Sequence, residues 1–344
     1  MFLLENVPLT SHSTMRLGGN ARYLTEIADR NELGATVSWA KEQNLPVLMI
    51  GSGSNIVWTD AGFAGVILIN KIMGYEVQEL TDSEMYVTAG AGMNWDEFVA
   101  KTVAQGLTGV EFLSLIPGTV GATPIQNVGA YGQEVANTIV TIQAYDSQTG
   151  QFVTLRASDC GFGYRSSIFK TTERGRYFIM AVTFFLRKGN PEQPYYASIN
   201  QYCQQHHIQH LTPAQGRQAT IEIRSSKLPD PAKVANNGSF FANPIISSEQ
   251  FVDLQADFPD VSYWPIGDGK TVKLSAAWLI EQAGFKDFHD PETGMATWPK
   301  QPLVLVNESA QSTAQLLAFK QKIVNAVAAK FNVTLSQEPE LLGS

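Results

Sequence analysis

A short run of glycines and small polar residues is the first pattern in this sequence that could bind a ligand. Gly51, Ser52, Gly53, Ser54 and Asn55 directly follow the apolar run at 47–50. Glycines let successive backbone N–H groups approach an anion, and the two hydroxyls add donors. The run lacks the lysine of a P-loop, and an apolar segment follows where a dinucleotide fingerprint requires a helix. Taken alone, it fits a tight turn better than a diphosphate site.

A second, longer glycine-rich loop extends from Pro117 to Gly132. Its glycines and two prolines alternate with small and apolar residues, which predicts an irregular and largely buried backbone. Loops of this kind usually hold a ligand at close range, and a flat aromatic cofactor would suit this one. The alternative is a well-packed crossover between domains.

Two polar side chains could act on a substrate. Arg165 lies in a polar turn just before an apolar pair, and arginine is the side chain that binds a carboxylate through two parallel hydrogen bonds. Ser239 lies between a glycine and two phenylalanines, where a hydroxyl could donate a proton or contact a ligand. Taken alone, each has a simpler interpretation: Arg165 as a surface charge and Ser239 as a serine in a turn. No GxSxG motif surrounds Ser239, so acyl transfer has little support.

The elements that must position these residues can be predicted from periodicity. The first half predicts an α+β arrangement rich in strands. Its helices are expected at 31–45 and 94–105, and its strands at 47–50, 65–70, 86–89, 139–145, 152–155 and 177–186. After the proline-rich segment 189–194, which predicts a domain boundary, helices are expected at 213–225, 247–255, 274–282 and 309–329, with a strand at 302–306.

Composition excludes several classes of protein. The chain has 344 residues, enough for two or three domains, and a net charge of −8 with no wide basic surface, so nucleic acid is not an expected partner. Its two cysteines lack metal-ligand spacing and suit a reducing compartment, and we expect no metal. The N-terminus does not resemble a secretory signal, and the longest apolar stretch is far shorter than the ~20 residues that span a bilayer. We therefore expect a cytoplasmic protein without membrane segments, and a monomer.

These motifs, in this order, resemble the UDP-N-acetylenolpyruvoylglucosamine reductase family in its longer form, which many Gram-negative bacteria have. The resemblance begins at Ser13 to Gly19, covers nearly the whole chain, and reaches the last strand. The loop 117–132 and the segment 238–244 are its most specific parts, whereas the first glycine loop is shared more widely among flavoproteins. The resemblance implies an α+β FAD-binding fold of the vanillyl-alcohol oxidase type at 1–188, divided near residue 70, followed by a smaller α+β substrate-binding domain at 200–344.

The resemblance also implies a cofactor and a reaction. FAD would be bound without a covalent link, since neither loop contains the His or Cys used for tethering. NADPH would reduce the FAD, which would then reduce the enolpyruvyl group of a UDP-sugar, a step in peptidoglycan synthesis and cell wall biogenesis. The implied FAD contacts are Gly51, Ser52, Gly53, Ser54 and Asn55 for the diphosphate, with Pro117, Gly118, Gly121, Ala122, Ile125, Val128 and Gly129 lining the flavin.

Three residues would carry the chemistry by this resemblance. Arg165 would stabilise negative charge at the substrate carboxylate, Ser239 would protonate the α-carbon, and a C-terminal glutamate would assist Arg165 or orient a water. The residues that would hold the UDP-sugar are Tyr196, Lys227, Asn243 and Gln301.

The C-terminal glutamate is ambiguous because the sequence departs from the family pattern. Counting from Phe331 without a gap selects Glu338, whereas matching the local Glu-Pro-Glu triplet selects Glu340. We favour Glu338, since an insertion would shift the register of a buried strand. Positions two apart on one strand point to the same side, so both carboxylates could face the pocket. Pro339 between them is consistent with an edge strand.

Two other functions remain open from the sequence. One is a flavin oxidase that acts on an alcohol with oxygen as acceptor, against which the missing tethering residue and the Ser239 segment count. The other is a nucleotide-binding protein without catalysis. The presence of Arg165, Ser239 and a C-terminal glutamate together disfavours it.

Overall fold

A computed structural model describes residues 2–267 and 269–343, and within it the chain divides into two compact units. Unit 1 comprises 1–7, 21–52 and 64–226, and unit 2 comprises 8–20, 53–63 and 227–344. Each unit is described by itself below. Each expected domain, 1–188 and 200–344, is one continuous segment, whereas each of the two units combines several segments of the chain. The expected domain boundaries stay a prediction.

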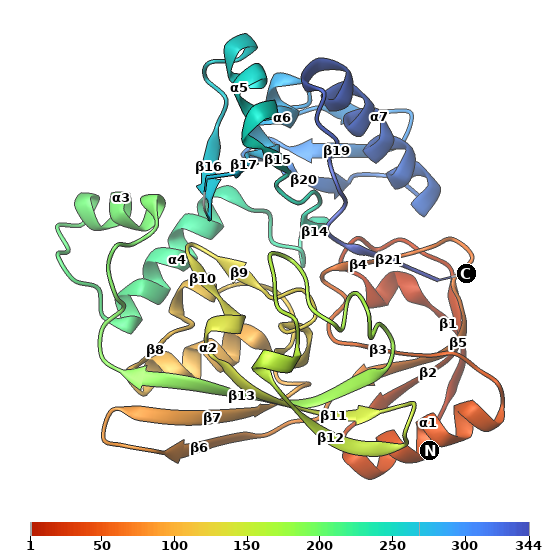
Figure 1. The fold of residues 1–344 in the computed structure, drawn as a ribbon. Helices are drawn as coiled ribbons and strands as arrows, with labels where there is room; N and C mark the ends of the chain where they lie inside the picture. Colours follow the sequence, from red (N-terminus) through yellow and green to blue (C-terminus); the bar gives the residue numbers. More distant parts are fainter. Residues whose placement is uncertain (1, 268, 344) are drawn as a thin grey trace. The chain divides into compact units, whose positions relative to one another are not determined.

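The described residues of unit 1 form two larger sheets and a small one (Figure 1). A four-stranded sheet has the order β1-β2-β5-β3 and comprises β1 (Leu4–Pro8), β2 (Asn20–Ile27), β5 (Phe63–Asn70) and β3 (Val47–Ile50). A six-stranded sheet has the order β12-β11-β13-β7-β6, with β8 also paired to β13, and comprises β12 (Gln151–Arg156), β11 (Ile139–Asp146), β13 (Tyr177–Lys188), β7 (Glu84–Gly90), β6 (Tyr75–Glu79) and β8 (Leu107–Thr108). The third sheet is the pair β9 (Gly129–Ala130) and β10 (Gln133–Glu134).

Helix α1 (Arg30–Glu42) packs with residues of both larger sheets. It begins where the Asp29 carboxylate accepts hydrogen bonds from the backbone N–H groups of residues 31 and 32. Its buried Leu33 and Val37 share one apolar cluster with Val66 of β5 and Phe178 of β13. The chain then enters β3, which pairs in parallel with β5 and ends at the first glycine loop.

Further helices of unit 1 lie before and after the second glycine loop in the chain. They are α2 (Trp95–Ala104), α3 (Ala197–Gln205) and α4 (Pro213–Lys227). Asn94 caps α2 by accepting from the N–H of Glu97, and Gly106 follows the helix with a φ of +72°. The loop between α2 and β11 is mostly irregular, with short 3₁₀ turns, as the glycines and prolines predict.

Unit 2 combines small sheets with helices. Within its described residues, one sheet has the order β14-β20-β19-β18, a second has the order β15-β17-β16, and the third is the parallel pair β21-β4. The strands are β14 (Ala235–Ser239), β20 (Gln301–Asn307), β19 (Met295–Trp298), β18 (His289–Asp290), β15 (Ile245–Ser247), β17 (Thr271–Leu274), β16 (Tyr263–Ile266), β21 (Glu340–Leu342) and β4 (Ile56–Trp58). The helices are α5 (Ser248–Asp257), α6 (Ala276–Gln282) and α7 (Thr313–Phe331).

The core of unit 2 gathers segments that are far apart in the sequence. Phe240 and Phe241, both fully buried, share an apolar cluster with Leu279 of α6, Phe319 of α7 and Val57 of β4. Helix α7 begins with a capping box between Ser312 and Gln315. The two phenylalanines next to Ser239 are therefore core residues, and they fix the backbone on which Ser239 lies.

The helices and strands expected from periodicity are confirmed, with shifts of a few residues at their ends. The strand expected at 47–50 coincides with β3, and the apolar run after the first glycine loop forms β4. Periodicity does not predict α3 or the sheet β15-β17-β16. No helix within 2–267 and 269–343 is long and apolar enough to cross a membrane.

Candidate active site

Thr14 joins the first glycine loop to the strand that carries Ser239, within unit 2. Its backbone N–H donates to the carbonyl of Gly53 (3.1 Å), and its carbonyl accepts from the N–H of Asn236 (3.0 Å). The side chain of Asn237 donates to the Thr14 hydroxyl (3.1 Å) and to the carbonyl of Ile56 (3.1 Å). The glycine loop and the backbone just before Ser239 are thus fixed to the same residue.

Ser239 ends β14 and lies next to the segment that carries Glu338. Ser239 is half-buried, and β14 has an irregular register against β20 between Asn236 and Ser239. The backbone N–H of Glu338 donates to the carbonyl of Phe240 (2.9 Å). An antiparallel bridge between Phe241 and Gln337 continues this pairing. Glu338 is therefore attached, through its backbone, to the residue that follows Ser239.

Glu340 is attached to a different segment. It is the first residue of β21, and its backbone N–H donates to the carbonyl of Asn55 (3.0 Å) at the end of the first glycine loop. Pro339, which is buried, lies between the two glutamates and directly precedes β21. Glu338 and Glu340 do not share a strand, because β21 begins only after Glu338. The expectation that both carboxylates could face the pocket stays a prediction.

The first glycine loop has no space for side chains at its glycines. A Cβ on Gly51 would lie 2.4 Å from the Thr119 hydroxyl, which belongs to the second glycine loop in unit 1. Gly53 has a φ of +71°, and a Cβ there would lie 2.2 Å from the carbonyl oxygen of His12 in unit 2. Backbone packed this closely against protein atoms requires glycine at both positions.

The second glycine loop is packed against the six-stranded sheet of unit 1. A Cβ on Gly121 would lie 2.5 Å from the Cβ of Ala91, which follows β7, and the N–H of Gly121 donates to the carbonyl of Ala91 (2.9 Å). Arg165 lies beside the same loop, where its Nη2 donates to the carbonyl of Gly129 (2.9 Å). The structure therefore brings Arg165 together with the loop expected to line the flavin.

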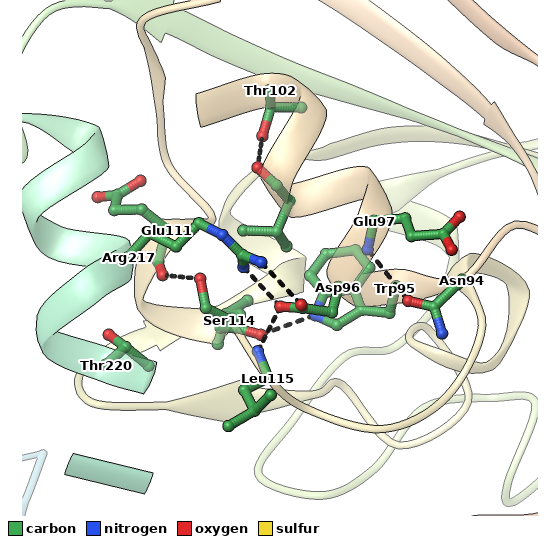
Figure 2. A network of polar contacts seen from close by, with 12 residues as sticks. Asn94, Trp95, Asp96, Glu97, Thr102, Glu111, Ser114, Leu115, Arg217 and Thr220 are labelled. Atoms are coloured by element: carbon green, nitrogen blue, oxygen red, sulfur yellow. Dashed lines mark hydrogen bonds and ion pairs between the residues drawn. The ribbon is translucent and has the colours of Figure 1, made fainter. Parts of the chain in front are cut away.

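The entrance to this loop is fixed by the carboxylate of Asp96, as Figure 2 shows. Oδ1 of Asp96 accepts from the N–H of Leu115 (2.5 Å), and both carboxylate oxygens accept from the guanidinium of Arg217 on α4 (2.5 and 2.7 Å). Burial by itself would raise the pKa of Asp96, but the hydrogen bonds from Arg217 and Leu115 outweigh it and the pKa is lowered. Leu115 has a φ of +59°, so this carboxylate supports a strained backbone two residues before Pro117.

Tyr196 and Tyr131 form an aromatic pair in unit 1. Their ring centroids are 5.9 Å apart and their planes are nearly perpendicular. Burial raises the pKa of both phenols, and Tyr131 is hydrogen-bonded to Arg224 of α4, whose own pKa is lowered by burial. Arg224 is thus a buried guanidinium bonded to one phenol of this pair.

Of the remaining residues expected to hold the UDP-sugar, two are joined through Trp298 in unit 2. The indole N–H of Trp298 donates to the carbonyl of Lys227 (3.0 Å), and Trp298 is paired with Gln301 across the turn between β19 and β20. Asn243 lies elsewhere in the unit. Its side-chain oxygen accepts from the N–H of Ala276, the first residue of α6 (3.0 Å).

Several residues that fix the site were not found from the sequence. They are Thr14 and Asn237 in unit 2, and Asp96, Asn127 and Arg217 in unit 1. Their hydrogen bonds join segments that are far apart in the chain, and no local spacing indicates such a contact. The available signal was that Thr14, Asn127 and Asn237 lie inside motifs already singled out.

Comparison with known proteins gives two family matches along the chain. Residues 21–156 match the FAD binding domain, and residues 230–342 match the C-terminal domain of UDP-N-acetylenolpyruvoylglucosamine reductase. A reductase of that name from Ralstonia nicotianae is 41% identical over 99% of this chain and 100% of its own length. The chain belongs to this family. The reductase of that name from Thermobifida fusca is 40% identical over 98% of both chains.

A solved structure supports the fold. The UDP-N-acetylenolpyruvylglucosamine reductase from Thermus caldophilus superposes with a TM-score of 0.67 over 99% of both chains, at 20% identity. The expected fold class, an α+β FAD-binding fold followed by a further α+β domain, is confirmed. At Gly51 and Gly53 a Cβ would collide with protein atoms, so only glycine fits there, and the hydroxyls of Ser52 and Ser54 beside them are donors suited to an FAD diphosphate.

Proposed function

We propose that this chain is an FAD-dependent oxidoreductase that uses NADPH to reduce the carbon–carbon double bond of UDP-N-acetylglucosamine enolpyruvate, forming UDP-N-acetylmuramate for peptidoglycan synthesis. The observation that carries the proposal is the full-length relationship to reductases of that name. The hydrogen bond between Glu338 and Phe240, which attaches a carboxylate-bearing residue next to Ser239, is the geometry that supports it. We further propose that the protein acts as a cytoplasmic monomer.

FAD, when bound, carries the hydride from NADPH to the substrate. Gly51 to Asn55 would hold its diphosphate, and the loop 117–132 would line the flavin. The supporting observations are the positive φ of Gly53 and the absence of space for a Cβ at Gly51, Gly53 and Gly121. Neither loop contains a Cys or His, which fits a cofactor without a covalent link.

Arg165 would bind the substrate carboxylate. Hydride addition at the β-carbon builds negative charge on the α-carbon and on this carboxylate. A guanidinium fixed beside it stabilises the transition state more than the ground state. The hydrogen bond to Gly129 supports this role, because it holds the guanidinium in place before substrate arrives.

Ser239 would complete the reaction by donating its hydroxyl proton to the α-carbon. A hydroxyl can do so because a carbanion-like centre is a strong base. Glu338 would assist by donating to the substrate carboxylate if protonated, or by orienting a water. The half-burial of Ser239 at the end of a strand that is bonded to the core supports a fixed position for its hydroxyl.

The UDP-sugar would be held by Tyr196, Lys227, Asn243 and Gln301. Lys227 is exposed and carries a positive charge suited to a diphosphate. Tyr196 lies beside Tyr131, which is bonded to Arg224.

Steady-state oxidation of NADPH tests the proposal. We expect oxidation that depends on the enolpyruvyl substrate, with UDP-N-acetylmuramate as the product by mass spectrometry. Oxygen consumption with an alcohol and no response to NADPH would instead establish an oxidase. Binding of a UDP-sugar without turnover would establish a non-catalytic protein.

A further inference from the structure

Arg165 lies on a short turn that is tied to the second glycine loop at three points within unit 1. The Ser167 hydroxyl, fully buried, donates to the carbonyl of Ile125 (2.5 Å). The side chain of Asn127 donates to the carbonyl of Gly163 (3.1 Å). Nη2 of Arg165 donates to the carbonyl of Gly129 (2.9 Å). The segments 125–129 and 163–167 are therefore joined side by side.

The turn itself requires support from outside. Gly163 and Ser166 exchange two backbone hydrogen bonds (3.0 and 3.2 Å), and Arg165 between them has a φ of +52°. The left-handed region is unfavourable for a residue with a Cβ, so Arg165 keeps this conformation only if its surroundings impose it.

Asn127 supplies that support through all parts of its amide. Besides Gly163, its Nδ2 donates to Oε2 of Glu134 (2.8 Å), and its Oδ1 accepts from the N–H of Ala136 (3.1 Å). Asn127 is 2% exposed and also has a positive φ, +48°. An amide that is this buried and fully bonded to protein holds segments together and does not contact a ligand.

The space around Gly129 links the same groups to the guanidinium. A Cβ on Gly129 would lie 2.9 Å from Cγ of Glu134 and 3.4 Å from Nη1 of Arg165. Glu134 and Arg165 thus flank one glycine, and the partner of Glu134 is Asn127. A change in the bonds of Asn127 would therefore shift Arg165 in two ways. One is a movement of Gly163 in the same turn, and the other is a movement of the Glu134 side chain, which lies on the other side of Gly129.

We propose that Asn127 is a positioning residue that sets the direction of the Arg165 guanidinium. The inference rests on the proposed function, in which Arg165 binds the substrate carboxylate. Loss of the bond from Asn127 to Gly163 leaves Arg165 in the protein but removes one of the three bonds that hold its turn, so the turn loosens and the guanidinium no longer meets the developing charge correctly. A misplacement of about 1 Å in such a group can lower a rate by about 10²-fold.

The test separates the two hydrogen bonds that Nδ2 of Asn127 donates, one to Glu134 and one to Gly163. Asn127→Asp keeps the acceptor for Ala136 but cannot donate to Gly163 or Glu134, and it places two carboxylates together. In the double variant Asn127→Asp with Glu134→Gln, the new amide donates to the new carboxylate, so the bond between positions 127 and 134 is restored with reversed polarity. Only the bond to Gly163 remains lost. Glu134→Gln alone keeps a side-chain oxygen for Asn127 and serves as its control.

Rapid-reaction kinetics of the FAD-loaded variants is the first measurement. For the double variant we expect flavin reduction by NADPH close to that of the wild type, and reoxidation by the enolpyruvyl substrate slower by about 10²-fold at saturating substrate. Hydrogen exchange of the backbone amides at 163–167 is the second measurement, and it does not depend on activity. We expect faster exchange in the double variant and unchanged exchange in Glu134→Gln.

A matched control loses a similar set of bonds elsewhere. In unit 2 the side chain of Asn307 donates to the carbonyls of Met15 and Ala310 and accepts from the N–H of Ala310. Asn307→Ala should leave the ratio of the two half-reaction rates unchanged. This result would show that a general loss of stability does not cause the selective slowing of flavin reoxidation in the double variant.

Two outcomes would overturn the inference. They are wild-type reoxidation in the double variant, and an equal slowing of both half-reactions. Arg165→Ala is measured in parallel. If reoxidation is slow in Arg165→Ala but normal in the Asn127 variants, only the proposed role of Asn127 is wrong. Normal reoxidation in Arg165→Ala would overturn the proposed role of Arg165 and this inference with it.

Discussion

The backbone N–H of Glu338 donates to the carbonyl of Phe240 (2.9 Å), so one of the two C-terminal glutamates is attached directly beyond Ser239. Glu340 is attached instead to Asn55 at the end of the first glycine loop. The proline between them lacks an N–H and lies where the chain changes partner. This relationship supports the choice of Glu338 as the catalytic carboxylate, which stays a prediction.

Replacing each glutamate by glutamine separates the two assignments. Glu338→Gln should slow reoxidation of reduced flavin by the substrate by at least about 10²-fold, the usual contribution of an acid–base group. Glu340→Gln should keep most of the activity, because its backbone bond to Asn55 does not use the carboxylate. Rapid mixing of reduced enzyme with substrate measures both rates. The reverse order of effects would select Glu340.

Ser239→Ala should act on only one half of the reaction. Flavin reduction by NADPH should remain nearly unchanged, whereas reoxidation by the enolpyruvyl substrate should slow by about 10²–10⁴-fold or more, since a lost proton donor affects only that step. The two half-reactions are followed separately by flavin absorbance. Equal slowing of both would assign a structural role to Ser239.

The sequence predicts those elements whose signals are local, and it does not predict contacts between residues far apart in the chain. Helix α2 was predictable because Asn94 and Gly106 are local start and stop signals next to a periodic apolar face. Helix α3 was missed because its sequence, ASINQYCQQ, is largely polar and buries only Ile199 and Cys203. Strand β16 contains Pro265, which counts against a strand in any local pattern.

The candidate site shows the same division. The two glycine loops, Arg165 and Ser239 stand out by residue type alone or by resemblance. The hydrogen bonds that fix them do not, since Asn127 bonds to Gly163 across 36 positions and Asn237 bonds to Thr14 across 223. The partner of Glu338 likewise follows from the pairing of 336–338 with 240–242 and not from any count along the C-terminus.

Gly53→Ala should remove FAD from the protein. Alanine is strained at a φ of +71°, and its Cβ would lie 2.2 Å from the carbonyl oxygen of His12. Gly106→Ala is a matched control, because Gly106 has a φ of +72° but a Cβ there would meet no atom of the described residues within 4 Å. The ratio of flavin to protein absorbance after purification measures the effect. Full retention of FAD by Gly53→Ala would contradict the assignment of this loop to the cofactor.

Asp96→Asn should destabilise the fold in a pH-dependent way. At pH 7 we expect the free energy of unfolding to fall by about 1–3 kcal/mol, because the hydrogen bonds from Arg217 and Leu115 lose a charged acceptor. The pKa of Asp96 is lowered in the folded state, so its contribution is full above the unfolded pKa, about 4, and is lost as the pH falls through the folded pKa. Urea unfolding at several pH values should show the gap between the two proteins closing in acid.

The exposed neighbour Glu97 provides the control for that experiment. Glu97→Gln removes a carboxylate from the same turn of α2, and the hydrogen bond to Asn94 uses only its backbone N–H. Its stability should follow the wild type at each pH. A pH-independent difference for Asp96→Asn would mean that the charge of Asp96 does not stabilise this segment.

The measurement that tests the whole account most directly is one anaerobic cycle of the bound flavin. Purified protein should be yellow, its absorbance should bleach on addition of NADPH, and the yellow colour should return on addition of UDP-N-acetylglucosamine enolpyruvate without oxygen. Acid should release intact FAD. Protein that takes up no FAD, or a flavin bleached by NADPH that only oxygen can reoxidise, would contradict the account.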